Sequence, residues 1–257
     1  MEQAGQFQAL VEKAEFSDHE GNLLDCEKGI QKNLGMLESL RDRGGNLFLV
    51  GNGGSAGVVS HILTDFINVN KLNARTLHES SLLSCMSNDY GYENSFSEPL
   101  STLAREKDLL IAVSSSGRSP NIHNAVKSIK KAGGEAITLS GFGRDNPLRS
   151  MGDLNVWLDS KSYGLVEIGH LFYLHYLSVQ IPNHHLTQKY KIGFKNGNLI
   201  KKNRSSDIGG LSSGYTSIGL DQFSDCGILL MTLYKKESTL ETAIVPKIPV
   251  PYKAKFH

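Results

Sequence analysis

Four short, nearly continuous apolar runs constrain the fold of this chain more than any other feature. They occupy residues 46–50, 108–113, 135–139 and 154–158. Runs of this kind are typical of strands buried in a parallel sheet. Between and after them lie helical stretches at about residues 55–66, 120–132 and 164–180. The alternation predicts an α/β fold, a doubly wound parallel sheet flanked by helices with flavodoxin-like layering.

The two ends of the chain differ from this alternating part. Residues 1–44 show apolar positions at helical spacing and predict a pair of helices that ends at Gly44 and Gly45. We assign residues 1–182 to one domain and residues 183–257 to a C-terminal extension of unknown role, either β-rich or poorly ordered. In that extension, Asn196 and Gly197 predict a hairpin turn between residues 190–194 and 199–200.

Charge and hydropathy exclude several classes of protein. The formal net charge is +1, so no strong field would attract nucleic acid or an anionic membrane. No apolar run approaches the roughly 20 residues of a membrane span, and the N-terminus lacks the pattern of a secretory signal. The three cysteines form no CxxC pair, so no zinc ribbon is predicted. We therefore expect a cytoplasmic protein without nucleic-acid or membrane partners.

Two turns that follow strands carry the first chemical signal. Residues 51–56 (GNGGSA) follow the first apolar run, and residues 114–119 (SSSGRS) follow the second. In doubly wound sheets, ligands bind outside the carboxyl ends of the strands. Glycine amides, serine hydroxyls and helix N-termini together suit a phosphate. The alternative for Ser119 is ordinary capping before Pro120, but capping leaves the three preceding serines unexplained.

Histidines paired with carboxylates on two helical stretches carry the second signal. His61 and Asp65 are four residues apart and share one helix face. Glu167 and His175 are eight apart, about 80° around a helix, so both can face one pocket. Such a set binds zinc or supplies a general base and a general acid. His170 points elsewhere around the same helix, and we expect it to be packed.

Four motifs in this order, GNGGSA, SNDYGYENSFS, VSSSGRSPNI and LVEIGHLFYLHYLSVQ, resemble the SIS (sugar isomerase) domain family and especially its phosphoheptose isomerases. The resemblance covers about residues 20–182. It implies an SIS-type fold, a homotetramer with sites at subunit boundaries and a zinc site made by His61, Asp65, Glu167 and His175. The substrate-binding residues that it implies are Asn52, Gly53, Ser55, Asp89, Ser114, Ser115, Ser116, Ser119 and Glu167.

The implied reaction converts sedoheptulose 7-phosphate to a manno-heptose 7-phosphate, a precursor of cell-surface glycans such as lipopolysaccharide or capsule. We expect Asp65 to act as the base and His175 as the acid, through an enediol. The family usually has Glu where this chain has Asp65 and Gln where it has Glu167. A substrate-binding arginine and aspartate of the family match Val69 and Gly164. These departures keep an alternative open, a non-catalytic module that senses sugar phosphates or binds protein.

Overall fold

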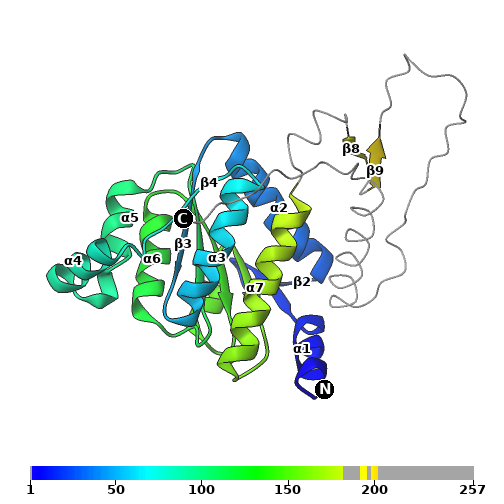
Figure 1. Ribbon diagram of the computed structural model, residues 1–257, viewed down its shortest axis with the longest axis horizontal. Helices are drawn as coiled ribbons and strands as arrows, with labels where there is room; N and C mark the ends of the chain where they lie inside the picture. Colours follow the sequence, from blue (N-terminus) through cyan, green and yellow to red (C-terminus); the bar gives the residue numbers. More distant parts are fainter. Residues whose placement is uncertain (1, 182–191, 196–197, 202–257) are drawn as a thin grey trace, which may run out of the picture.

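A seven-stranded sheet forms the centre of the computed structural model, which describes residues 2–181, 192–195 and 198–201. Along the sheet the strands follow the order β2-β1-β7-β6-β5-β3-β4. Figure 1 shows helices α3 and α7 side by side next to this sheet. Strands β3 to β7 pair in parallel, as the alternating sequence predicts. Their bounds are β1 Glu15–Asp18, β2 Leu23–Leu24, β3 Asn46–Gly51, β4 Asn73–Thr76, β5 Leu109–Ser114, β6 Glu135–Ser140 and β7 Leu154–Trp157.

Helices cover both faces of this sheet. They are α1 Glu2–Glu12, α2 Cys26–Asp42, α3 Gly54–Asn68, α4 Ser80–Tyr90, α5 Ser97–Leu103, α6 Pro120–Lys131 and α7 Tyr163–Gln180, with 3-10 turns η1 Tyr92–Asn94 and η2 Pro147–Ser150. Apolar side chains of α2, α3 and α7 pack on one face, and those of α5 and α6 on the other. The doubly wound α/β prediction is therefore confirmed.

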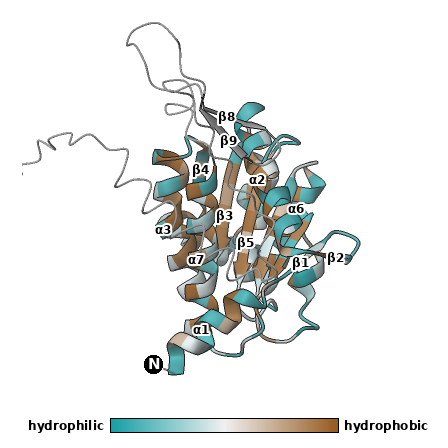
Figure 2. Ribbon diagram, turned by 90° about the vertical axis from the view of Figure 1, so that its right-hand side faces the viewer, coloured by the Kyte–Doolittle hydropathy of each residue, from teal (hydrophilic) through white to brown (hydrophobic). Residues whose placement is uncertain are grey.

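Strand β3 shows how the sequence builds the two layers. Successive side chains of a strand point to opposite faces of a sheet. Leu47 and Leu49 accordingly join the core under α3 and α7, whereas Phe48 and Val50 join the core under α5 and α6. All four are fully buried. Figure 2 shows β3 and β5 as hydrophobic strands in the interior, with helices beside them.

The N-terminal part contains the predicted pair of helices, α1 and α2, and in addition a hairpin that helical periodicity does not predict. Strands β1 and β2 form a short antiparallel hairpin between α1 and α2, and β1 also pairs antiparallel with β7. The Asp18 carboxylate accepts the backbone N–H groups of Glu20 and Asn22 and so closes the turn. Phe16, 1% exposed, fastens the hairpin to the core. This hairpin gives the parallel sheet an antiparallel edge that helical periodicity does not reveal.

The segment between residues 69 and 104 was also left without predicted elements. Edge strand β4 contains one buried residue, Ala74, and α4 contains none, so neither has the apolar pattern of a core element. Strands β8 (Ile192–Lys195) and β9 (Asn198–Lys201) pair antiparallel, which confirms the predicted hairpin. The rest of the predicted extension lies outside the described residues. No helix within the described ranges is long and apolar enough to span a membrane.

Candidate active site

The glycine turn (residues 51–56) and the serine turn (residues 114–119) lie side by side. Each follows a parallel strand, and β3 pairs directly with β5, with Gly51 opposite Val113. The hydroxyl oxygens of Ser55 and Ser115 are 3.5 Å apart and link the two turns. The two predicted turns therefore lie together at the carboxyl edge of the sheet, where doubly wound folds bind ligands.

Glycine is required in the first turn for two separate reasons. At Gly51, a Cβ atom would lie 2.7 Å from the backbone carbonyl of Ser55, which cannot move without opening the first turn of α3. Gly53 has φ +53°, in the region that favours glycine. It occupies the N-cap of α3, and no side chain caps this helix end. The N-terminus of α3 thus keeps backbone N–H groups for an anion.

Ser119 does not behave as an ordinary cap in the serine turn. It stands at the N-cap of α6, yet its side chain makes no capping hydrogen bond. Its hydroxyl lies instead 3.3 Å from the hydroxyl of Ser114. The backbone N–H of Arg118 donates to Ser116 Oγ. This arrangement favours ligand binding over capping as the explanation of the serines.

Three residues that were not predicted as site residues, Asn121, Tyr92 and His78, hold the glycine turn by hydrogen bonds. Asn52 and Asn121 donate to each other through their side-chain amides, with both distances 2.9 Å. The hydroxyl of Tyr92 donates to Asn52 Oδ1 at 2.9 Å. Tyr92 lies in the SNDYGYENSFS motif, and Asn121 in SSSGRSPNI, but neither motif indicates a contact with Asn52. Tyr92 and Asn121 come 40 and 69 positions after Asn52 in the sequence, so only the folded chain brings them to its side chain.

His78 is the third of these residues. It follows β4, the neighbour of β3, and its Nε2 accepts the backbone N–H of Gly51 at 3.2 Å. Nε2 can accept only when the proton is on Nδ1, and Nδ1 is buried without a hydrogen-bond partner. Burial lowers the pKa of His78 below its usual 6.5, so the ring is neutral at pH 7. No sequence signal marks this histidine.

Asp65 and His175 form a hydrogen-bonded pair between α3 and α7. His175 Nδ1 lies 2.9 Å from Asp65 Oδ2, and both side chains are about one third exposed. Ser178 Oγ also approaches the same carboxylate oxygen, at 3.3 Å. The ring of His61 meets the ring of His175 edge to face, with centroids 5.1 Å apart. Helix packing therefore brings together the predicted base and the predicted acid.

Glu167 lies apart from this pair. Its carboxylate covers Gly54 at the start of α3, where a Cβ atom would approach within 2.3 Å of it. Eight residues of helix separate Glu167 from His175 by about 12 Å along the axis, a rise that the angular argument from the sequence omitted. A single chain thus does not gather the four predicted zinc ligands.

The donor types of this quartet, imidazole nitrogen and carboxylate oxygen, suit zinc. Among the described residues, however, no three His, Cys, Asp or Glu side chains lie close enough together to hold one metal ion. The Asp65 oxygen nearest to His175 is already engaged by that ring. As arranged within one chain, the quartet does not fit a zinc ion.

The remaining residues that the sequence analysis named are a buried histidine and three exposed residues. His170 is fully buried, its Nε2 lies 3.2 Å from the Ser140 carbonyl, and burial lowers its pKa to about 4, as expected of a packed histidine. Asp89 lies exposed in the last turn of α4 and accepts a hydrogen bond from the side chain of Asn88. Val69 is the C-cap residue of α3 and Gly164 is the second residue of α7, and both are exposed.

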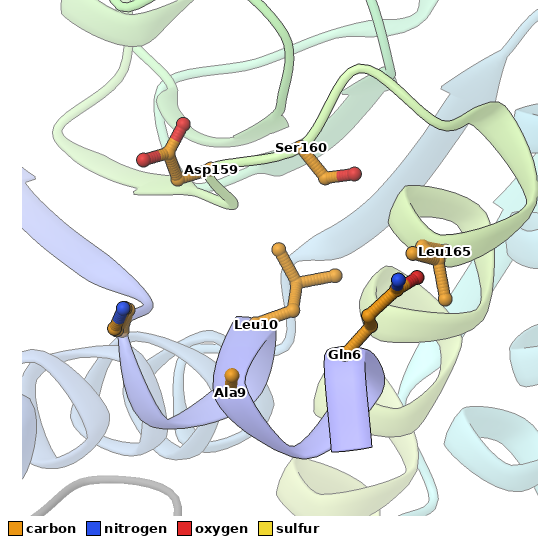
Figure 3. A pocket seen from close by; sticks show the side chains of 7 residues that line it. Gln6, Ala9, Leu10, Asp159, Ser160 and Leu165 are labelled. Atoms are coloured by element: carbon orange, nitrogen blue, oxygen red, sulfur yellow. The ribbon is translucent and has the colours of Figure 1, made fainter. Parts of the chain in front are cut away.

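A pocket of about 300 Å³ lies elsewhere, between α1 and the loop after β7 (Figure 3). Its walls carry Leu10 and Gln6 from α1, Asp159 and Ser160 from the loop, and Leu165 from α7. No residue predicted to bind substrate or metal lines it. The chemistry assembled at the two turns and at the Asp65–His175 pair is therefore separate from this pocket.

Known proteins resemble part of this chain in sequence. The SIS domain model matches residues 26–141. A phosphoheptose isomerase of Campylobacter concisus is 32% identical over 166 residues, 62% of this chain and 85% of its own length. Phosphoheptose isomerase 1 of Campylobacter jejuni is 33% identical over 178 residues, 65% of this chain and 94% of its own.

Solved structures agree with the sequence relatives. The phosphoheptose isomerase GmhA of Neisseria gonorrhoeae superimposes with a TM-score of 0.56 and 25% identity, over 60% of this chain and 85% of GmhA. The phosphoheptose isomerase of Francisella tularensis shares the fold with the same TM-score at 24% identity. Sequence motifs, sheet topology and relatives agree, and the chain therefore belongs to the phosphoheptose isomerase family of SIS-domain enzymes.

Proposed function

We propose that this chain is a sugar-phosphate isomerase that interconverts sedoheptulose 7-phosphate and a glycero-manno-heptose 7-phosphate. The observation that carries the proposal is the hydrogen bond between Asp65 and His175. Isomerisation through an enediol needs one group that moves a proton on carbon and another that moves a proton on oxygen. A carboxylate next to an imidazole supplies both.

The proposed isomerisation has two steps, formation of the enediol and its conversion to the aldose. Asp65 removes a proton from C1 of the open-chain ketose while the C2 carbonyl oxygen gains a proton, which gives the enediol. The hydroxyl on C1 then loses its proton as the new carbonyl forms, and Asp65 returns its proton to C2. His175 Nε2 gives its proton to the C2 carbonyl oxygen in the first step and takes one from the C1 hydroxyl in the second, so the ring ends the reaction as it began. We assign the donor role to His175 Nδ1, 2.9 Å from Asp65 Oδ2, and we assign His175 Nε2 and Asp65 Oδ1 to the substrate.

The phosphate of this substrate belongs, in our proposal, at an anion cradle. We use this name for Asn52, Gly53, Ser55, Ser114, Ser115, Ser116 and Ser119. The cradle offers hydroxyls and, at the start of α3, uncapped backbone N–H groups, which bind a dianion by donated hydrogen bonds. Asp89 and Glu167 stay predicted substrate-binding residues.

The separation of the cradle from the Asp65–His175 pair supports a site shared between copies of the chain. Asp65 comes eleven positions after Gly54 in α3, a rise of about 16 Å, which exceeds the span of a heptose phosphate. We propose a homotetramer in which the cradle of one copy faces the pair of another. A closed symmetric oligomer presents each pair to one cradle.

Zinc stays a prediction within this proposal. For His61, Asp65 and His175 to share an ion with Glu167, a second copy would have to supply the glutamate. A zinc ion held there would polarise the carbonyl and hydroxyl oxygens of the sugar. Adding zinc to the assay, or removing it with a chelator, tests this prediction apart from the roles of the two proton carriers.

The decisive experiment measures isomerisation of sedoheptulose 7-phosphate by the purified chain, by Asp65→Ala and by His175→Ala. Asp42→Ala and His19→Ala are matched controls, because both residues are exposed and neither belongs to the cradle or to the Asp65–His175 pair. We expect turnover in the wild type and the controls and its loss in both site variants. A wild type that binds sugar phosphates without converting any would favour the non-catalytic sensing module.

A further inference from the structure

We propose that Asn121 is a positioning residue that locks Asn52 and holds the glycine turn against the serine turn. Neither the sequence motifs nor the family resemblance assigns Asn121 a role. The inference rests on the proposed function, because the effect of Asn121 on sugar-phosphate affinity presupposes the anion cradle.

Burial and three hydrogen bonds fix the orientation of the Asn121 side chain. The residue is 1% exposed. Its Oδ1 accepts the backbone N–H of Ile122 at 3.0 Å and the side-chain N–H of Asn52 at 2.9 Å. Its Nδ2 donates to Asn52 Oδ1. The backbone donor of Ile122 determines which end of the amide is oxygen, so the pairing with Asn52 has one defined polarity.

This pairing determines what Asn52 can offer a ligand. A carboxamide has two N–H donors and an oxygen with two lone pairs. Asn52 Oδ1 accepts from Asn121 and from Tyr92, which uses both lone pairs. One N–H goes to Asn121. Asn52 is left with a single N–H donor, so it recognises an acceptor such as a phosphate, carbonyl or hydroxyl oxygen of the substrate.

The same pairing connects the two turns. Asn52 lies in the glycine turn, and Asn121 lies in the first turn of α6, two residues after Ser119. The other side-chain link between the turns is the long Ser55–Ser115 contact of 3.5 Å. Buried paired amides are expensive to break, because each partner would keep unsatisfied groups. Asn121 therefore sets the spacing across which the phosphate binds.

The first test compares the steady-state kinetics of wild type and Asn121→Ala with sedoheptulose 7-phosphate. We expect KM to rise roughly tenfold with a much smaller change in kcat, because two hydrogen bonds that hold the binding residue are lost. Asn121→Asp keeps the acceptor for Asn52 and Ile122, and we expect an intermediate KM. An unchanged KM in both variants would overturn the proposal.

Tyr92→Phe provides a second variant that keeps the fold, since the side chain of Tyr92 is half exposed. It frees one lone pair of Asn52 Oδ1, and we expect KM to rise a few fold. In an Asn52→Ala background, neither Tyr92→Phe nor Asn121→Ala should raise KM further, because both act through Asn52. Effects that persist in full in that background would contradict the positioning role.

Hydrogen exchange separates this inference from the proposed function. In the free protein, the amides of residues 51–56 should exchange faster in Asn121→Ala than in wild type, without added sugar. If the wild type converts no sugar phosphate while this difference appears, the proposed function fails and the locking role stands. Equal exchange at the glycine turn in both proteins refutes the locking role.

Discussion

The two ends of helix α3 carry different kinds of chemistry. At its start, the anion cradle consists of backbone N–H groups and neutral hydroxyls held by Asn121 and His78. Near its end, the Asp65–His175 pair consists of ionisable side chains about one third exposed. The cradle is organised by the turns of one chain, whereas the pair projects from the surface of two packed helices.

This difference indicates separate tasks. A phosphate dianion is best bound by donors already in place, because no ordering cost is then left for the binding step. A proton carrier must instead reach the reacting carbon and oxygen of the substrate, and partial exposure leaves it accessible to another surface. We therefore expect substitutions in the cradle to change KM and substitutions in the pair to change kcat.

Replacing the pair gives the largest expected effect. Asp65→Asn keeps the size of the side chain but removes the base, and His175→Asn removes the imidazole nitrogen that faces the substrate. We expect kcat to fall roughly a thousandfold in either variant, with KM within about threefold, since general acid–base catalysis contributes 10²–10⁴. Steady-state kinetics measure both constants. A fall in affinity instead would assign the pair to binding.

A negative charge in the cradle gives the next largest effect. Aspartate is a good N-cap, so Ser119→Asp should leave α6 intact while it repels the phosphate. We expect kcat/KM to fall about a hundredfold, mainly through KM, as two like charges in close contact imply. Ser119→Asn, a neutral cap of the same shape, is the control. Equal kinetics in the two variants would place the phosphate elsewhere.

Protonation of His78 gives the smallest effect. Above its lowered pKa the neutral ring accepts the Gly51 N–H, and below it Nε2 carries a proton and cannot accept. As pH falls from 7 to 5, KM should therefore rise about threefold more in wild type than in His78→Gln, whose amide oxygen does not titrate. If the KM of the two proteins changed with pH in the same way, His78 would have no role in holding the cradle.

The sequence reveals local units of this fold better than contacts between them. Each core strand of the parallel sheet has an apolar run of its own, and the turns at residues 51–56 and 114–119 follow directly from glycine and serine positions. The hairpin of β1 and β2 was missed because its strands are short and its order depends on pairing with β7, more than 130 residues away.

The candidate site shows the same limit. Asp65 and His175 were predicted, and their meeting follows from the packing of α3 on α7. Glu167 was placed with them because a helix angle was counted without its rise. Asn121 and His78 carry no local signal, because each acts by a hydrogen bond to a residue distant in the sequence. Such roles depend on tertiary geometry, which spacing along one helix does not encode.

Mixing two impaired variants, assayed at a sugar concentration well below the wild-type KM, tests most directly whether one site needs two copies of the chain. Asp65→Asn keeps an intact cradle, and Ser119→Asp keeps an intact pair. If the cradle of one copy serves the pair of another, co-expressed variants should regain activity at roughly a quarter of the sites. If each chain carries a complete site of its own, the mixture will be as inactive as either variant alone, and the shared-site account will be contradicted.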